Sequence, residues 1–143
     1  MQISKMMDDL KIKYGTMNPF ILSEHMNIEI KYVNFLKNPR GQYTTILGDQ
    51  VILLSNSIQD TNEEYFVCAH ELGHALLHTD TSGYYSLNNS TKNKSEYEAS
   101  RFATKLIYEL YKEEHDFELC KVDLLSKEYG LPETFYFILE QIS

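Results

Sequence analysis

The sequence from residue 70 to residue 74, His70-Glu71-Leu72-Gly73-His74, matches the HExxH pattern of metal-dependent hydrolases. Two histidines four residues apart lie on one face of a helix, one turn from each other, so their imidazoles can share one metal ion. The glutamate between them, Glu71, can then act as a general base toward water. Because so short a pattern also occurs by chance, its surroundings must decide whether it marks a metal site.

The surrounding residues predict a buried helix. Residues 61–64 match a capping box, with Thr61 as the N-cap and Glu64 at the third helical position, and the helical pattern continues to about His78. This helix is apolar on almost all sides, so it should be buried. Polar side chains buried there need partners, because unpaired buried polar groups cost free energy. A bound metal would be such a partner; histidines that bond to carbonyl groups of the core are the alternative.

A third protein ligand is expected, because catalytic zinc sites usually contain three. His78 lies two turns from His70 and is poorly placed to join it, so we expect it to hydrogen-bond beside the site or at the helix end. Cys68 faces the opposite side of the helix from His70, and we expect it to be a buried apolar residue. The remaining candidates are carboxylates on a second helix.

The second helix is predicted from about Lys94 to about Glu113, with Ser95 as its N-cap. Periodicity places Glu96 on the inward side of this helix, whereas Glu98 shares a side with basic residues that should face solvent. Glu96 is therefore the predicted third ligand, although a carboxylate in the first turn can also stabilise the helix dipole. The inward side carries small and apolar residues that would let the two helices approach closely: Ala99, Ala103, Leu106, Ile107 and Leu110.

Two segments together resemble the ImmA/IrrE family of metallopeptidases. Residues 70–78 read His-Glu-Leu-Gly-His-Ala-Leu-Leu-His, and residues 96–106 read Glu-Tyr-Glu-Ala-Ser-Arg-Phe-Ala-Thr-Lys-Leu. The family's second element runs Glu-x-Glu-Ala-Asn-x-Phe-Ala-x-x-Leu-Leu, so the resemblance covers about residues 61–107. Known members are small cytosolic zinc proteins of bacteria, phages and integrative elements, and the best understood cut helix-turn-helix repressors encoded beside them.

The resemblance implies one Zn²⁺ ion bound by His70, His74 and Glu96, with Glu71 as the catalytic base. It also implies a protein substrate, namely a DNA-binding repressor. The sequence departs from the family pattern at Ser100, which replaces the usual Asn or Asp and implies a weaker hydrogen bond behind a ligand. It also lacks the Met-Pro pair that often closes the second helix, which leaves the C-terminal geometry open.

The chain length of 143 residues suits one domain with a substantial core. We expect a single metallopeptidase domain over 1–143, with a core of 18–113 and a C-terminal helical segment of 117–142. The net charge of −8, with no basic cluster, disfavours direct binding to nucleic acid or to anionic membranes. Cys68 and Cys120 form no disulfide framework. The N-terminal residues do not resemble a secretory signal, and no apolar run in the sequence could span a membrane. We therefore expect a cytoplasmic protein.

Three segments before the motif read as strands: residues 28–35, 42–47 and 50–54. The last two flank Gly48-Asp49, which predicts a two-residue hairpin turn of type II′. We expect a small, mostly antiparallel three-stranded sheet beside the zincin-like active-site helices, which is an α+β fold. Zinc peptidases commonly bind substrate as a strand added at such an edge, so this hairpin is either the substrate-binding edge or only structural.

Two further segments have ambiguous roles. Residues 79–95 form a long polar loop that joins the two metal-bearing helices, and a tyrosine within it either steadies an oxyanion or is an ordinary surface residue. The segments 117–129 and 133–142 read as a helical hairpin, which could be a DNA-reading pair. Residues 118–143 contain two lysines against five acidic residues, so packing or partner docking is favoured.

The predicted function is metal-assisted hydrolysis of a peptide bond in a partner regulatory protein, a phage or mobile-element repressor. The alternative is a non-catalytic, zinc-containing anti-repressor that acts by binding its partner. A complete HExxH favours catalysis, because a purely structural site has no use for Glu71. A DNA-binding regulator is a third hypothesis, which the negative net charge disfavours.

Overall fold

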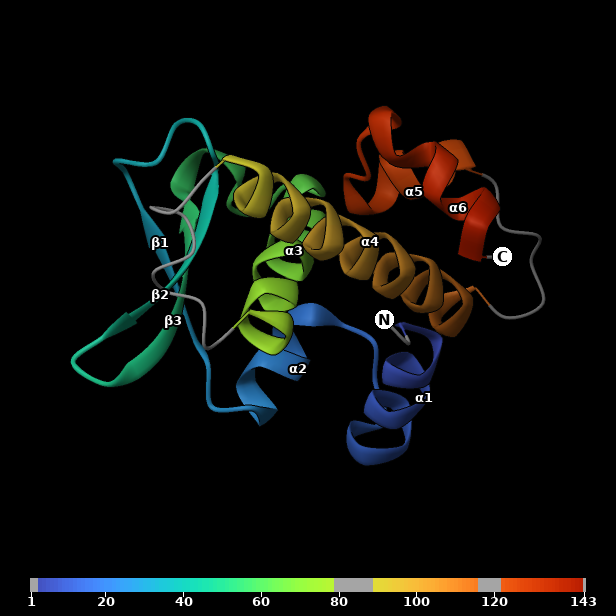
Figure 1. The fold of residues 1–143 in the computed structure, drawn as a ribbon, viewed down its shortest axis with the longest axis horizontal. Helices are drawn as coiled ribbons and strands as arrows, with labels where there is room; N and C mark the ends of the chain where they lie inside the picture. Colours follow the sequence, from blue (N-terminus) through green and yellow to red (C-terminus); the bar gives the residue numbers. More distant parts are fainter. Residues whose placement is uncertain (1–2, 79–88, 116–121, 143) are drawn as a thin grey trace.

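The computed structural model describes residues 3–78, 89–115 and 122–142 (Figure 1). Its elements are, in chain order, α1 (Ile3–Tyr14), α2 (Pro19–His25), β1 (Glu29–Val33), β2 (Gly41–Ile46), β3 (Asp49–Ser55), η1 (Asn56–Ile58), α3 (Glu63–Leu77), α4 (Asn89–Glu114), α5 (Val122–Tyr129), η3 (Glu133–Phe135) and α6 (Tyr136–Ile142). The sheet lies at one end of the molecule, α3 and α4 pack together at the centre, and α5 and α6 pack on α4 (Figure 1). The predicted α+β class is confirmed.

The sheet is built around β3, its central strand. The strand order is β1-β3-β2, with β3 parallel to β1 and antiparallel to β2. Residues 51–54 of β3, Val-Ile-Leu-Leu, are all buried, which is typical of a strand covered on both faces. The three predicted strands are present, and their pairing is mixed. β2 is an edge strand of this sheet, and it contacts α3.

The hairpin between β2 and β3 turns one residue earlier than expected. Leu47 and Gly48 have φ values of 51° and 87°. Positive φ at both central residues defines a type I′ turn, so the prediction of a type II′ turn at Gly48-Asp49 was wrong. Asp49 is instead the first residue of β3, where it pairs with Ile46. Gly48 still explains the turn, because glycine adopts positive φ without strain.

The start of α3 differs from the predicted capping box. Thr61 Oγ1 donates to the carbonyl oxygen of Ile58, 2.7 Å away, so it bonds to the turn before the helix. Asn62 occupies the N-cap position without a side-chain hydrogen bond to the helix. The capping-box prediction was therefore wrong, although the helix itself is confirmed. Glu63 and Glu64 lie in its first turn, where negative charge is favourable.

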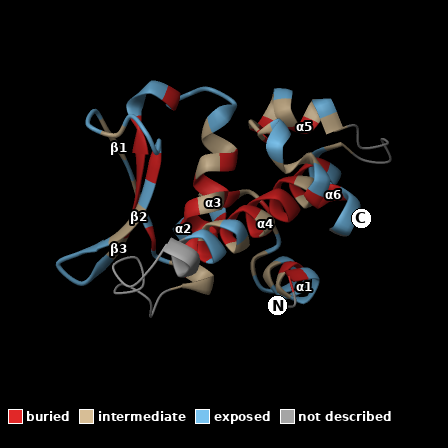
Figure 2. Cartoon of the chain, turned by 45° about the horizontal axis from the view of Figure 1, so that its top comes forward, coloured by how far each residue is buried: buried red, intermediate tan, exposed pale blue. Residues whose placement is uncertain are grey.

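Small residues let α3 and α4 pack closely. The predicted inward stripe of α4 is buried, and Figure 2 shows it as a red band along this helix. A methyl group at Gly73 would lie 3.0 Å from Phe102 Cδ1 and 3.2 Å from the carbonyl oxygen of Ala99, so glycine allows a contact that alanine would hinder. α4 begins at Asn89, before the predicted start, so Ser95 lies inside the helix and is not its N-cap.

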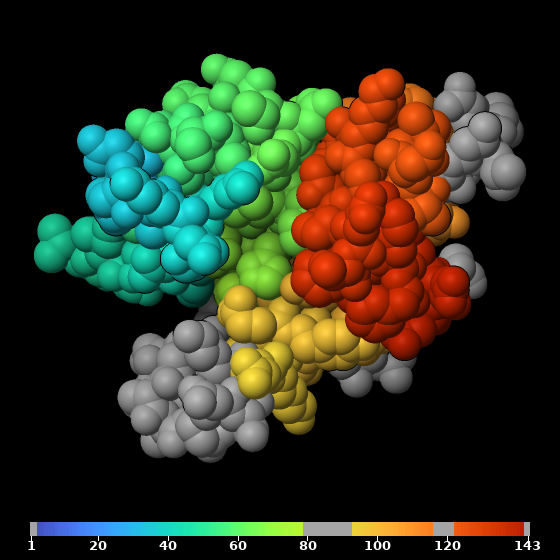
Figure 3. Space-filling model, turned by 90° about the horizontal axis from the view of Figure 1, so that it is seen from above, coloured from blue at the N-terminus to red at the C-terminus, as the bar shows by residue number. Residues whose placement is uncertain are grey.

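The predicted C-terminal helical hairpin is confirmed for the described residues. Its chain turns at Gly130, and two aromatic pairs join it to the rest of the fold. Phe135 stacks on Phe66 of α3 with ring centroids 5.7 Å apart, and Phe137 stacks on Tyr97 of α4 at 6.4 Å. In Figure 3 these helices, in red, lie on one side of α3 and the strands on the other. Among the described helices, none has the length and apolar character needed to cross a bilayer.

Candidate metal centre

The side chains of His70, His74 and Glu96 meet between α3 and α4. His70 Nε2 lies 3.2 Å from Glu96 Oε1, and His74 Nε2 lies 2.6 Å from Glu96 Oε2. One ligand atom from each residue lies within 4.8 Å of the others. Two imidazole nitrogens and a carboxylate oxygen suit Zn²⁺ and several other divalent ions. The structure therefore brings together the three residues that the sequence suggested as ligands.

Helix geometry and close packing account for this convergence. His70 and His74 lie one turn apart on α3, with ring centroids 4.9 Å apart. Gly73, which lies between them in sequence, lets α4 approach α3 at Ala99. Glu96 lies about one turn before Ala99, so its side chain reaches both histidines. It is 46 % exposed, so the centre is open to solvent on this side.

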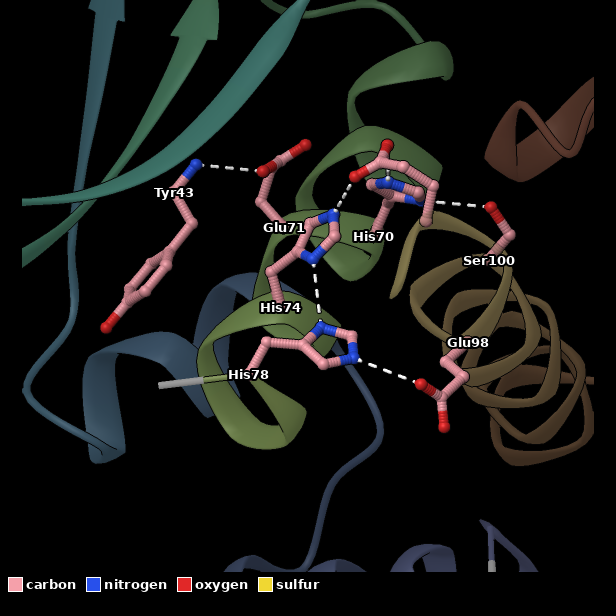
Figure 4. Close-up of polar contacts among 8 residues, drawn as sticks. Tyr43, His70, Glu71, His74, His78, Glu98 and Ser100 are labelled. Atoms are coloured by element: carbon pink, nitrogen blue, oxygen red, sulfur yellow. Dashed lines mark hydrogen bonds and ion pairs between the residues drawn. The ribbon is translucent and has the colours of Figure 1, made fainter. Parts of the chain in front are cut away.

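The second ring nitrogen of each histidine also has a polar neighbour (Figure 4). Ser100 Oγ lies 3.2 Å from His70 Nδ1, and His78 Nδ1 lies 3.1 Å from His74 Nδ1. Both Nε2 atoms are therefore directed toward Glu96. Metal-binding histidines usually hydrogen-bond through their second nitrogen in this way, so the residues present fit a metal ion. The contact expected behind a ligand is present at Ser100.

Glu71 is held apart from the three candidate ligands. The backbone N–H of Tyr43 donates to Glu71 Oε1 over 2.8 Å, and Glu71 is only 7 % exposed. Burial raises the pKa of Glu71 to about 7, while His74 opposes this shift and the charge of Glu96 adds to it. A carboxylate with a pKa near neutrality is well suited to exchange protons with water at neutral pH.

The pKa values of Glu96 and His78 are both lowered, for different reasons. Burial alone would raise the pKa of Glu96, but hydrogen bonds from His70 and His74 outweigh it and hold the pKa well below its usual range. Burial lowers the pKa of His78, although its hydrogen bond to Glu98 opposes the shift. Glu96 is therefore anionic, and His78 neutral, at neutral pH.

Neither His78 nor Cys68 joins the three candidate ligands. His78 lies beside His74, as predicted, and Cys68 is buried. Glu98 was expected to face solvent, and this expectation was wrong: Glu98 Oε1 lies 3.4 Å from His78 Nε2, and the side chain is 24 % exposed. The C-terminal turn of α3 covers this flank of α4, which the periodicity of one helix cannot reveal. The loop tyrosines considered as oxyanion donors lie outside the described residues.

Two contributions of β2 were missed by sequence reasoning. The backbone amide of Tyr43 orients Glu71, and a backbone donor has no sequence signature. Gly41 permits the close contact between β2 and α3, because a methyl group there would lie 2.5 Å from Val67 Cγ1 and 3.2 Å from Glu71 Cγ. A glycine at the start of a strand was the only available signal, and it marks close backbone approach.

Comparison with known proteins agrees with this geometry. The profile of the peptidase M78 family, described as the IrrE N-terminal-like domain, matches residues 23–136. The chain belongs to this family. The ImmA/IrrE resemblance inferred from the two sequence segments is thereby confirmed, and the family is one of metallopeptidases.

Two curated relatives are similar to this ImmA/IrrE chain. "Metallopeptidase ImmA" of Bacillus subtilis (strain 168) is 34 % identical over 101 residues, which cover 66 % of this chain and 56 % of the relative. "Uncharacterized immunity region protein 2" of Bacillus phage phi105 is 32 % identical over 97 residues, which cover 66 % of this chain and 61 % of the relative. The matched region thus spans less than two thirds of either relative. No solved structure matches the chain.

Proposed function

We propose that the chain is a zinc-dependent endopeptidase in which His70, His74 and Glu96 hold the ion and Glu71 is the catalytic base. The observation that carries this proposal is the division of roles along one helix. Three ligand atoms converge within 4.8 Å, while Glu71 is bonded to the backbone of β2 beside them. A purely structural ion would have no use for this buried carboxylate, whose burial costs free energy. Membership of a metallopeptidase family supports the same conclusion.

The residues of the site have separate tasks in hydrolysis. Bound here, a Zn²⁺ ion would act as a Lewis acid toward a peptide carbonyl and a water molecule. Glu71 accepts a proton from the attacking water and returns it to the amine nitrogen of the leaving group. Tyr43 N–H bonds one oxygen of this carboxylate and so fixes its orientation. Ser100 and His78 hold the two imidazole rings in place.

The edge of β2 that faces away from β3 is the proposed binding site for the substrate backbone. Tyr43 N–H points away from β3 and toward Glu71. Alternate residues of an antiparallel strand direct their backbone groups to the same side, so the backbone of Thr45 faces the same edge. A substrate segment added there as a strand would pass Glu71. The position of β2 supports a substrate-binding role for the hairpin over a merely structural one.

The proposed substrate is a helix-turn-helix repressor of a phage or mobile element, and we place the reaction in the cytoplasm. The relative from phage phi105 is named an immunity region protein, which supports a partner of this class. The net charge of −8 suits contact with a basic DNA-binding protein, because complementary charge steers association.

The test is Glu71→Gln, which keeps the size of the side chain and an oxygen that can accept from Tyr43 N–H. Purified wild type and variant are incubated with zinc and a purified helix-turn-helix repressor of a phage or mobile element, and fragments are measured by mass spectrometry. We expect the variant to bind zinc but to cut at least about 10²-fold more slowly, because general-base catalysis supplies this much. Glu140→Gln, an exposed change of the same charge on α6, should cut like the wild type.

Two results would contradict the proposal. If Glu71→Gln cuts the repressor at the wild-type rate, Glu71 is not the base. If the zinc-loaded wild type inactivates the repressor without cutting it, the alternative of a zinc-containing anti-repressor that acts by binding is correct.

A further inference from the structure

We propose that Glu98 and His78 form an oriented hydrogen-bond chain that fixes His74 in the tautomer able to bind a metal. This inference deepens the proposed function and rests on its metal site. It makes His78 and Glu98 positioning residues: both act through His74, and neither is a ligand or a reacting group. The chain runs from Glu98 on α4 through His78 at the C-cap of α3 to His74, one turn earlier.

A metal bound at Nε2 of His74 would fix the direction of each hydrogen bond. His74 Nδ1 and His78 Nδ1 are 3.1 Å apart, so one must carry a proton and the other must not. A histidine that offers the lone pair of Nε2 to a metal carries its proton on Nδ1, so His74 is the donor and His78 Nδ1 the acceptor. The proton of His78 then lies on Nε2, which is 3.4 Å from Glu98 Oε1. Each group in the chain thus has the partner that its protonation state requires.

Burial and backbone bonding hold the hydrogen-bond chain in place. The His74 and His78 side chains are mostly buried, at 8 % and 9 % exposed, so water competes little for their ring nitrogens. His78 is also fixed through its backbone, because its N–H donates to the carbonyl oxygen of His74 over 2.9 Å. The two rings are adjacent because residues four apart lie on one face of a helix.

The two candidate histidine ligands therefore have unequal support. His70 is backed by the neutral hydroxyl of Ser100, whereas His74 is backed by a second imidazole that leads to a carboxylate. A carboxylate behind a histidine orients the ring and raises its basicity as a ligand. Here His78 transmits that effect from Glu98, because Glu98 Oε1 lies 3.4 Å from His78 Nε2 and His78 Nδ1 lies 3.1 Å from His74 Nδ1. We therefore expect His74 to bind the metal more tightly than it would without His78 and Glu98 behind it.

The first experiment observes the tautomers directly. Long-range ¹H–¹⁵N correlation spectra of the ¹⁵N-labelled, zinc-loaded protein report which ring nitrogen carries the proton. We expect His74 to be protonated at Nδ1 and His78 at Nε2, the opposite tautomers. A proton on Nδ1 of His78, or a doubly protonated His78, would reverse or break the chain and overturn the inference.

The second experiment measures zinc affinity by competition with a chromophoric chelator. His78→Leu removes the acceptor for His74 and should raise the apparent Kd for zinc by about tenfold or more, as loss of such outer contacts usually does. His78→Asn places an oxygen near the position of Nδ1 but cuts the link to Glu98, so it should lie between the wild type and His78→Leu. Circular dichroism checks that each variant is folded.

Glu98→Gln separates charge from hydrogen bonding. The amide oxygen can still accept from His78 Nε2–H, so the tautomer should persist while zinc binding weakens by less than in His78→Leu. Glu140→Gln changes the net charge equally on an exposed face of α6 and should bind zinc like the wild type. His78→Asn and Glu98→Gln keep the polarity of the site. They therefore test the hydrogen-bond chain even if His78→Leu does not fold.

The outcomes distinguish this inference from the proposed function. If the wild type binds zinc stoichiometrically and the His78 and Glu98 variants bind it as tightly as Glu140→Gln, only the proposed hydrogen-bond chain is refuted. If the wild type binds no zinc, or if His74→Ala binds it equally well, the metal site itself is refuted and the inference falls with it.

Discussion

Replacing Gly73 with alanine should destabilise the protein, although alanine is the better helix former. Gly73 lies within α3, at a point where α4 approaches closely. A methyl group there would lie 3.0 Å from Phe102 Cδ1, 3.2 Å from the carbonyl oxygen of Ala99 and 3.3 Å from its Cα. The ring of Phe102 can shift, but two of these three contacts are with backbone atoms of a buried helix.

The net effect is a balance of two opposing contributions. In an unhindered helix, glycine to alanine stabilises by about 0.5–1 kcal/mol. Inserting a methyl group into a close-packed core costs about 1–3 kcal/mol, because neighbours must move. We therefore expect Gly73→Ala to lower the free energy of unfolding by about 1 kcal/mol, and the Tm by about 2–4 °C for a domain of this size.

The assay is urea unfolding of the metal-free protein with chelator present, since a bound ion would add its own stabilisation. Asp8, an exposed residue in the middle of α1, calibrates helix propensity in the same chain. Asp8→Ala should be more stable than Asp8→Gly by about 0.5–1 kcal/mol. If Gly73→Ala is as stable as the wild type or more stable, α4 can yield, and the argument from close packing fails.

Gly41→Ala should cost about 1–3 kcal/mol and slow cleavage, because its methyl group meets Val67 beside Glu71, the proposed base. Adding Val67→Ala should recover part of the lost stability. If the effects of the two substitutions simply add, direct contact between the two side chains is contradicted. Glu109 has a lowered pKa, because its bonds to Lys112 and Lys105 outweigh the effect of burial. Its contribution to stability is therefore present above the unfolded-state pKa of about 4.3 and is lost as the pH falls through the lower folded-state value. Glu109→Gln should cost up to about 1 kcal/mol at neutral pH and less in acid, and urea unfolding that shows the same deficit at both pH values would contradict this.

The sequence alone determined the parts that depend on local periodicity. Positions four apart on one helix put His70 and His74 on a common face, whatever else packs around them. The inward stripe of α4 predicted Glu96 as the third ligand, because a helix that buries Ala99 also directs the residue one turn earlier toward the same neighbouring helix. The periodicity of α3 and that of α4 were therefore enough to predict the three candidate ligands. The HExxH motif added Glu71 beside them.

Local patterns were less successful at the ends of elements. Thr61 has the residue type and spacing of an N-cap, yet its hydroxyl bonds to the preceding turn. Gly48 marked the hairpin, but the register of β2 and β3 placed the turn at Leu47-Gly48. In both cases two local arrangements satisfy the same residues, and the path of the neighbouring chain decides between them.

Only the tertiary structure decided how the site is supported. The amide of Tyr43 reaches Glu71 because β2 is an edge strand that lies against α3, and Gly41 makes that approach possible. Glu98 meets His78 because two helices cross at a particular place and angle. Periodicity describes the faces of one helix by itself, whereas these contacts depend on the relative positions of separate elements. The sequence thus determined the residues of the candidate metal site, and tertiary packing determined the groups that orient them.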